Sequence, residues 1–276
     1  HLASLPALFM TGDINVLVTE TDLESYPGMW LRGMGSNSLK AVFPAYPAEE
    51  ELVRDRDLKV ASRRDFIAET EGIRAYPWRV FVISEGDAGL IESNLSYILA
   101  GECMMEETAW IKPGKVAWDW WNYNNIYGVD FRAGVNNKTY EHYIDFASEN
   151  SIEYVILDEG WYKLGDVLDV VPEIDVAHLC NYAESRGVGV ILWVVWNTLD
   201  ERMDQALAQF KSWGVKGIKV DFMQRDDQKV VDYYWKLAQK AAFHNLLVDL
   251  HGSYKPSGLR RTWPNVLTRE GVKGLE

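Results

Sequence analysis

The chain has 276 residues, a length that accommodates one large domain or two modest ones. Its formal net charge of −13 argues against a nucleic-acid partner, because phosphate binding requires basic patches. No apolar run reaches the length of a membrane span. The two cysteines, Cys103 and Cys180, give neither a disulfide framework nor a zinc spacing, and we expect both to be free and mostly buried. The count of 12 tryptophans and 14 tyrosines is high, which suits a large core and also a protein that stacks on sugar rings.

The first part of the chain, residues 1–112, consists of short β-like runs broken by glycine, proline and aspartate. Residues 15–20 and 78–84 are two such runs, and turn signals such as 26–29 separate them. Strands joined by turns with little helix favour a β-sandwich. The charge-rich segment 49–71 is predicted to form strand edges or loop. We therefore interpret residues 1–112 as the C-terminal part of an N-terminal β-sandwich domain.

From residue 113 onward, strand and helix patterns alternate. Apolar strands are predicted at residues 116–121, 154–159, 189–196, 218–222, 246–251 and 266–270. Amphipathic helices are predicted at residues 138–151, 176–185, 201–213 and 227–242. Continuous apolar strands between such helices indicate a parallel sheet covered on both faces, either an open doubly wound sheet or a (β/α)8 barrel.

The barrel is the favoured alternative. A glycine-rich phosphate loop does not follow the first strand, which counts against an open dinucleotide-binding sheet. Successive strands instead end in polar residues, as the rim of a barrel does. These residues are Asp119, Asp158, Glu159, Asn197, Asp221, His251 and Glu270. We predict an α/β fold in which residues 113–276 form a (β/α)8 TIM barrel truncated after about six strands.

Carboxylates at strand ends could hydrolyse a glycosidic bond, which requires two carboxyl groups on opposite sides of the bond. The acids in suitable positions are Asp119, Asp158, Glu159, Asp221, Glu270 and Glu276. The alternative for each of them is a structural role, as a helix cap or as the partner of a lysine or arginine. Taken together with the interleaved tryptophans and histidine, the set favours a catalytic site.

Two pairs of nearby residues allow a more specific prediction. Lys219 and Asp221 are two residues apart, so their side chains point to the same face of a strand. They form either a buried structural ion pair or a site in which Lys219 binds a sugar hydroxyl and keeps Asp221 ionised. Asp158 and Glu159 are adjacent, so at most one of them faces the barrel centre.

Aromatic and histidine side chains at the strand ends remain open to two interpretations. Trp121, like the other tryptophans near the strands, is more often a core residue than a sugar platform, and we include it only as a candidate. His251 is either a ligand of a sugar hydroxyl or a core histidine with satisfied hydrogen bonds, and the first is favoured.

Several segments resemble glycoside hydrolase family 97. The resemblance rests on Lys-Val-Asp-Phe-Met-Gln at 219–224, His-Gly-Ser-Tyr-Lys-Pro at 251–256 and Arg-Arg-Thr-Trp-Pro-Asn-Val-Leu-Thr-Arg-Glu-Gly-Val-Lys-Gly-Leu-Glu at 260–276. Residues 18–29, Val-Thr-Glu-Thr-Asp-Leu-Glu-Ser-Tyr-Pro-Gly-Met, are similar to the sandwich domain that precedes the barrel in this family.

The resemblance implies a β-sandwich joined to a (β/α)8 barrel that cleaves α-glucosides or α-galactosides. Asp221 matches the nucleophile of the retaining branch of the family, and Glu276 matches its general acid/base. The inverting branch carries a glutamate base at the position of Gly252, so the glycine favours retention. The resemblance also implies a Ca²⁺ ion held by Glu20, Glu270 and Glu276. Because Glu276 is the last residue of the sequence, we expect the chain to be a fragment of a longer enzyme.

We therefore predict a retaining α-galactosidase that works by double displacement on an oligosaccharide with a terminal α-linked galactose or glucose. The predicted substrate-binding residues are Lys219, His251, Asp119, Trp121 and Asp158. The alternatives are an inverting, calcium-dependent α-glucosidase and a carbohydrate-binding protein without turnover. The family's members are mostly exported by bacteria, which implies a periplasmic or otherwise exported protein.

Overall fold

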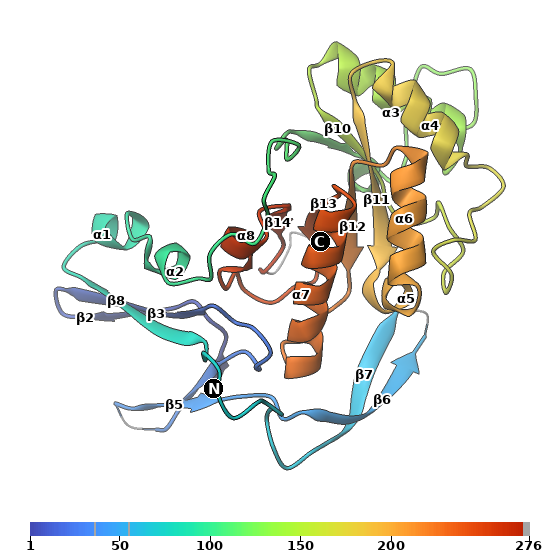
Figure 1. The fold of residues 1–276 in the computed structure, drawn as a ribbon. Coiled ribbons are helices and arrows are strands. Elements are labelled where there is room, and N and C mark those ends of the chain that lie inside the picture. The colour runs from blue at the N-terminus through green and yellow to red at the C-terminus, as the bar shows by residue number, and fades with distance from the viewer. Residues whose placement is uncertain (36, 55, 273–276) are drawn as a thin grey trace.

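A computed structural model describes residues 1–35, 37–54 and 56–272 (Figure 1). The N-terminal strands are β1 (Leu2–Ala3), β2 (Ala7–Thr11), β3 (Ile14–Thr21), β4 (Trp30–Gly33), β5 (Leu39–Val42), β6 (Pro47–Val53), β7 (Asp57–Arg63) and β8 (Trp78–Ser84). They form antiparallel sheets in the orders β1-β4-β5, β2-β3-β8 and β6-β7. Two short helices that the sequence pattern does not predict, α1 (Asp87–Ile91) and α2 (Leu95–Ile98), follow.

The C-terminal part alternates strands and helices. Its strands are β9 (Val116–Trp118), β10 (Tyr154–Leu157), β11 (Gly189–Val195), β12 (Gly217–Asp221), β13 (Leu247–Leu250) and β14 (Val266–Arg269). Its helices are the 3-10 turn η1 (Asp119–Asn122), α3 (Asn137–Glu149), α4 (Val176–Glu184), α5 (Trp196–Glu201), α6 (Met203–Trp213), α7 (Gln228–Phe243) and α8 (Leu259–Thr262). The strands form one parallel six-stranded sheet in the order β14-β13-β12-β11-β10-β9.

This sheet confirms the predicted alternating architecture of an incomplete barrel preceded by antiparallel sheets. Every residue of β10 and β11 is buried, as expected for strands covered on both faces. The main helices α3, α4 and α7 begin with an Asn or Asp cap whose side chain accepts a hydrogen bond from a backbone N–H in the first turn. The domain boundary at residue 113 stays a prediction, and it falls between β8 and β9.

Two strands end where aromatic residues continue the predicted run. The first strand stops at Trp118, where its pairing with β10 ends, and the chain turns into η1. The third stops at Val195, the last residue of β11 that pairs with β12, and α5 begins at Trp196. Periodicity alone does not detect these ends, because the aromatic residues that follow are compatible with either structure. Cys180 is buried, but Cys103 is exposed, so the prediction that both cysteines are buried is wrong for Cys103.

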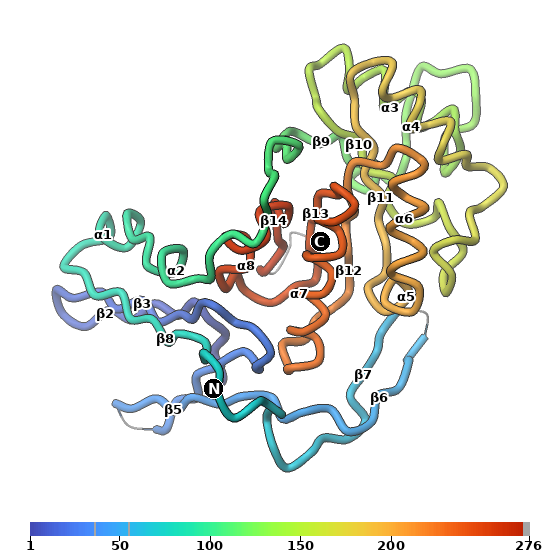
Figure 2. The backbone as a smooth tube through the Cα atoms, in the orientation of Figure 1, coloured from blue at the N-terminus to red at the C-terminus, as the bar shows by residue number. Residues whose placement is uncertain are grey.

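The N-terminal part contacts the C-terminal part at several places. The β6–β7 hairpin extends toward α5 and β11 (Figure 1), where Arg56 pairs with Glu159 at 2.7 and 2.8 Å. Arg225, which precedes α7, pairs with Glu50 of the same hairpin at 2.6 Å. The connection from α2 to β9 runs past α8 (Figure 2), and Thr262 of α8 donates a hydrogen bond to the Gly101 carbonyl oxygen at 3.0 Å.

A buried lysine forms a further contact between the two parts. The Nζ atom of Lys255 lies 2.6 Å from Oε1 of Glu20, which is 0% exposed, and 3.3 Å from Oδ2 of Asp226. Arg79 lies on the other side of Glu20 at 2.8 Å. Gly28 is packed so tightly here that an added Cβ would lie 2.3 Å from Oδ2 of Asp226. A buried charge without its partner is costly, so these ions hold the two parts of the chain in one arrangement.

No helix in the parts of the chain that the structure describes has the length and apolar character needed to cross a membrane.

The Lys255 contact predicts a large loss of stability when its charge is removed. Lys255→Met removes the cation beside Oε1 of buried Glu20 and leaves Arg79 as its remaining ion-pair partner, so we expect the free energy of unfolding to fall by about 3–5 kcal/mol. Lys163→Met is the matched control, because Lys163 pairs with Asp169 on the surface, where such a pair contributes about 0–1 kcal/mol. Denaturant unfolding of both variants measures the difference. Equal effects of the two substitutions would contradict the stabilising role assigned to the buried Lys255 ion pair.

Candidate active site

The candidate site lies at the carboxyl ends of the parallel strands. Asp221 is the last residue of β12, Asp158 follows β10, and His251 follows β13. Because parallel neighbours end at the same edge of a sheet, these side chains are brought to one rim, the place where barrel enzymes carry their active sites.

Lys219 is the centre of the charged cluster. Its side chain is 3% exposed, and its Nζ atom lies 2.6 Å from Oδ2 of Asp158 and 3.9 Å from Oδ2 of Asp221. The ammonium also lies 4.4 Å from the Trp118 ring, whose Nε1 donates to the same Asp158 oxygen at 2.6 Å. The alternation of the strand therefore predicts the shared face of Lys219 and Asp221 correctly. The ion pair itself is strongest with Asp158.

The Asp221 carboxylate is held from two sides. Its Oδ2 accepts a hydrogen bond from Nε1 of Trp193 at 3.0 Å, and its Oδ1 accepts one from the backbone N–H of Phe222 at 2.8 Å. Burial raises the pKa of Asp221, while the charge of Lys219 and the Trp193 hydrogen bond oppose the rise. Since each carboxylate oxygen has a second lone pair, either can still approach an electrophile.

Adjacent acids Asp158 and Glu159 point to different partners, as alternation predicts. Asp158 faces Lys219 inside the sheet rim, whereas Glu159 forms its bidentate pair with Arg56 of the N-terminal hairpin. The Arg56 guanidinium also lies 5.2 Å from the centre of the Phe222 ring, directly after Asp221 in the chain.

Asp119 is almost fully buried, so little of its surface is accessible to a substrate. Its side chain is 1% exposed, and it accepts a hydrogen bond from the Tyr140 hydroxyl at 2.7 Å and weaker ones from the backbone N–H of Asp158 at 3.3 Å. Burial raises the pKa of Asp119 to about 6, because the Asp158 charge adds to the burial and the Tyr140 hydrogen bond only partly offsets it. A role in substrate binding stays a prediction.

His251 and Trp121 surround the same rim. His251 lies 3.3 Å from Oδ2 of Asp249 and 3.5 Å from Oε2 of Glu270. Burial lowers the pKa of His251, but the hydrogen bond and charge of Asp249 outweigh it, so the pKa is raised overall. Trp121 is 64% exposed and stacks on Trp118 with ring centres 5.8 Å apart. An exposed ring beside the rim is available as a sugar platform, and this role stays a prediction.

The predicted calcium ligands are not brought together by the described residues. Glu20 is already neutralised by Lys255 and Arg79 in the contact described above. Glu270 accepts a hydrogen bond from the Gly252 N–H at 3.2 Å, and Glu276 lies outside the described residues. Across residues 1–35, 37–54 and 56–272, three or more His, Cys, Asp or Glu side chains that could hold a metal ion are not found together. Glu20 therefore does not fit a calcium site in this arrangement, and calcium stays a prediction.

The structure adds two residues that sequence reasoning did not assign to the site. Trp193 contacts Asp221, although the apolar run of β11 indicates only a core residue. Tyr140 contacts Asp119 from α3, although its helical spacing likewise indicates core packing. Both have apolar rings in the core and a single polar atom at the site, and hydrophobic periodicity does not register that atom.

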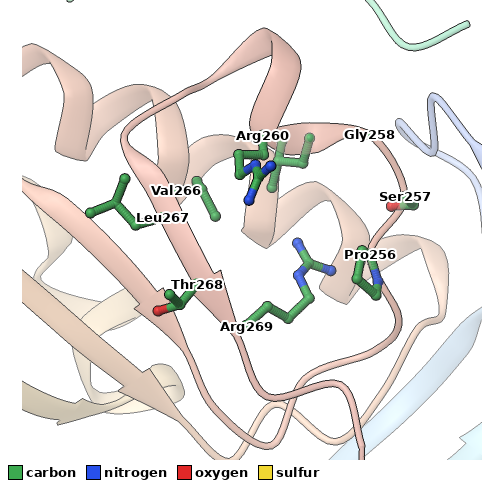
Figure 3. A pocket seen from close by; sticks show the side chains of 9 residues that line it. Pro256, Ser257, Gly258, Arg260, Val266, Leu267, Thr268 and Arg269 are labelled. Atoms are coloured by element: carbon green, nitrogen blue, oxygen red, sulfur yellow. The ribbon is translucent and has the colours of Figure 1, made fainter. Parts of the chain in front are cut away.

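Two cavities of about 340 Å³ flank the rim. One lies between the N-terminal part and the sheet, and Trp30, Gln224, Gly252 and Glu270 are among its lining residues. The other lies beside β14, where Arg260 and Arg269 extend toward the cavity (Figure 3). Asp221 lines neither cavity, so the location of the chemistry rests on the strand ends and the charged cluster.

Comparison with known proteins gives consistent matches. The family model Glycoside hydrolase 97 matches residues 120–272, and Glycosyl-hydrolase 97 N-terminal matches residues 1–101. A protein of Bacteroides thetaiotaomicron named "Retaining alpha-galactosidase" is 47% identical over 282 residues, which cover 100% of this chain and 43% of the relative. A "Probable retaining alpha-galactosidase" of Streptomyces bingchenggensis is 37% identical over 75% of this chain and 33% of the relative. The chain thus spans less than half the length of these curated relatives.

Solved structures match the same fold. A glycoside hydrolase family 97 enzyme of Pseudoalteromonas sp. strain K8, in complex with acarbose, superposes with a TM-score of 0.83 at 23% identity, over 99% of this chain and 44% of that one. A β-arabinopyranosidase superposes with a TM-score of 0.75 at 27% identity, over 97% of this chain and 41% of that one.

Asp119 gives a testable pH dependence of stability. Because its folded pKa is raised from 3.8 to about 6, its contribution to stability is complete below pH 3.8 and is lost as the pH rises through about 6. We expect Asp119→Asn to gain about 2 kcal/mol in unfolding free energy relative to the parent protein between about pH 4.5 and pH 7. Tyr140→Phe removes the hydrogen bond that opposes the shift, so it should steepen the parent's pH dependence. Parallel stability curves for the parent and Asp119→Asn would contradict this interpretation.

Proposed function

Because this chain belongs to glycoside hydrolase family 97, we propose that the protein containing it is a retaining α-galactosidase that acts on oligosaccharides with a terminal α-linked galactose. The observation that carries the proposal is Asp221, a partly buried carboxylate at a strand end, oriented by hydrogen bonds and close to the Lys219 cation. The name of the Bacteroides relative at 47% identity supports the same activity.

The proposed reaction is a double displacement. An oxygen of Asp221 attacks the anomeric carbon, the glycosidic C–O bond breaks, and Glu276 donates a proton to the leaving oxygen. Water deprotonated by Glu276 then attacks the same carbon and releases the sugar with its α configuration and Asp221 as a carboxylate. A separation of roughly 5–5.5 Å between the two carboxyl groups is the geometry that retention requires, against roughly 6.5–9.5 Å for inversion.

The cluster around Asp221 supports this role of the carboxylate. Lys219 stabilises the ionised nucleophile that the first step needs and is itself anchored by Asp158. When Asp221 becomes a neutral ester in the intermediate, Lys219 keeps Asp158 as its counter-charge, so the site does not acquire an unpaired buried cation. His251 and Trp121 would bind the sugar at the same rim.

The assignment of Asp221 predicts a near-complete loss of turnover on substitution. We expect Asp221→Asn to lower kcat/KM on nitrophenyl α-galactoside by several orders of magnitude, about 10⁴-fold or more, because covalent catalysis is removed. Asp169→Asn, an exposed acid in a surface pair, is the matched control and should leave the rate unchanged. Azide should restore turnover to Asp221→Gly and yield the β-galactosyl azide, because the small anion enters from the face that the side chain has vacated.

Two outcomes would point to the alternatives. NMR detection of β-galactose or β-glucose as the first-formed anomer from an α-substrate would indicate an inverting enzyme. Sugar binding with unchanged function in Asp221→Asn would indicate a carbohydrate-binding protein. Parallel assays with α-galactoside, α-glucoside and β-arabinopyranoside establish the sugar preference, and the last is included because of the β-arabinopyranosidase match.

Calcium dependence is a separate part of the proposal. A hard cation near Glu270 and Glu276 would be bound through oxygen ligands and would supply electrostatic orientation of the sugar. If the ion is required, prolonged dialysis against a chelator should abolish activity, and added Ca²⁺ should restore it. Calorimetric titration of the dialysed protein with Ca²⁺ provides a binding readout that does not depend on activity. Full activity after chelation, with no binding heat, would remove calcium from the proposal.

We further propose that the protein is exported from a bacterial cell. Fractionation of the native host, with the activity measured in each compartment, tests this proposal.

A further inference from the structure

The Trp193–Asp221 hydrogen bond joins two neighbouring strands at the site. In the parallel pairing of β11 with β12, Trp193 lies opposite Lys219 and Val195 lies opposite Asp221. The indole therefore reaches diagonally, by two residues, to place its Nε1 atom 3.0 Å from Oδ2 of Asp221. Trp193 is only 1% exposed, so this polar atom is directed at the carboxylate in a place with little competing water.

Trp193 is itself fixed in position from the side of β10. The pairing of β10 with β11 ends at Leu157 and Leu192, so the carbonyl oxygen of Trp193 has no partner in β10. Nε1 of Trp161 donates to that oxygen at 2.7 Å. The backbone N–H of Val195 donates to the Tyr162 hydroxyl oxygen, with 3.1 Å between the nitrogen and the oxygen.

Aromatic packing restrains the indole ring as well. Its centre lies 6.1 Å from the Tyr162 ring and 6.3 Å from the Phe222 ring, which meets it edge-on. Phe222 also supplies the backbone N–H that holds Oδ1 of Asp221. The two oxygens of the carboxylate are thus oriented by groups that pack against each other.

The charges that face Asp221 come from its own strand and from the next one. Lys219 of β12 lies 3.9 Å away, and His251, after β13, acts through its charge. Burial raises the pKa of Asp221, and Lys219, Trp193 and His251 each counter part of that rise. Trp193 differs from the two cations because a neutral N–H donor requires a defined direction, so it fixes the carboxylate plane as well as favouring its ionised form.

We propose that Trp193 is a positioning residue that holds the Asp221 carboxylate in the orientation needed to attack the anomeric carbon. The inference rests on the proposed function of Asp221 as nucleophile. Trp193 contacts the carboxylate and is 1% exposed, and the segment containing Trp161 and Tyr162 supports it from behind.

Replacement of the indole N–H tests the inference. In the full-length protein, we measure kcat/KM on nitrophenyl α-galactoside as a function of pH. Trp193→Phe should move the acidic limb of this pH profile upward by about one to two pH units. The reason is that the ionised carboxylate loses a donor, so its pKa rises. We expect kcat to fall by about ten- to a hundredfold even on the plateau, because the carboxylate plane is no longer fixed.

A substitution of matched shape guards against a folding defect. Incorporation of benzothienylalanine at position 193 replaces the N–H by sulfur and keeps the ring size, so it should produce the same shift in a protein with an unchanged circular dichroism spectrum. The same analogue at position 235 is the control. It removes the indole N–H that donates to the Leu23 carbonyl oxygen at 2.7 Å, and it should lower the melting temperature without moving the acidic limb.

The outcomes separate this inference from the proposed function. Activity retained in Asp221→Asn would remove the nucleophile and both proposals with it. An inactive Asp221→Asn together with an unmoved acidic limb and parent-level kcat in the position-193 analogue would overturn only the role of Trp193. A uniform loss of rate at every pH, without a shift of the limb, would assign Trp193 a merely structural role and would likewise overturn it.

Discussion

The arrangement of the strand ends depends on one buried cation. Lys219 enters the rim on the same face as Asp221, and an ammonium with 3% exposure is stable there only when carboxylates surround it. Asp158 supplies the close partner at 2.6 Å, and Trp118 covers the remaining side with its ring. β12 and β10 are therefore tied across β11 at their carboxyl ends. Asp221 therefore lies near the positive charge of Lys219, while Asp158 forms the closer ion pair with that lysine.

Ion pairs with the N-terminal part also fix the loops around the rim. Lys255 lies four residues after His251 in the chain, and its ion pair with Glu20 fixes the loop that carries both. On the opposite side, Arg56 pairs with Glu159, the neighbour of Asp158. The loops after β10 and β13 thus each receive a charged contact from the antiparallel sheets. The N-terminal part is in this way a structural component of the site, not an appended module.

The sequence predicts those features that follow from the local period of the chain. Alternation places Lys219 with Asp221 and separates Asp158 from Glu159, and the structure agrees with both. The partners across strands were not predictable, because they depend on register. Trp193 reaches Asp221 only because β11 and β12 pair with Val195 opposite Asp221. Similarly, nothing local to Glu20 indicates that Lys255, more than two hundred residues away, will neutralise it.

Gly252 links the backbone to the stereochemical proposal. Its φ is +53°, and an added Cβ would lie 3.3 Å from Oδ1 of Asp221 and from the Phe222 nitrogen. A glutamate there would need a left-handed backbone and would bring a second carboxylate beside the first, which raises the pKa of at least one of them. A nucleophile at 221 must stay ionised, whereas a base at 252 must leave room for a water molecule. A nucleophile at position 221 and a base at position 252 would compete for the same space. Gly252 leaves that space to Asp221.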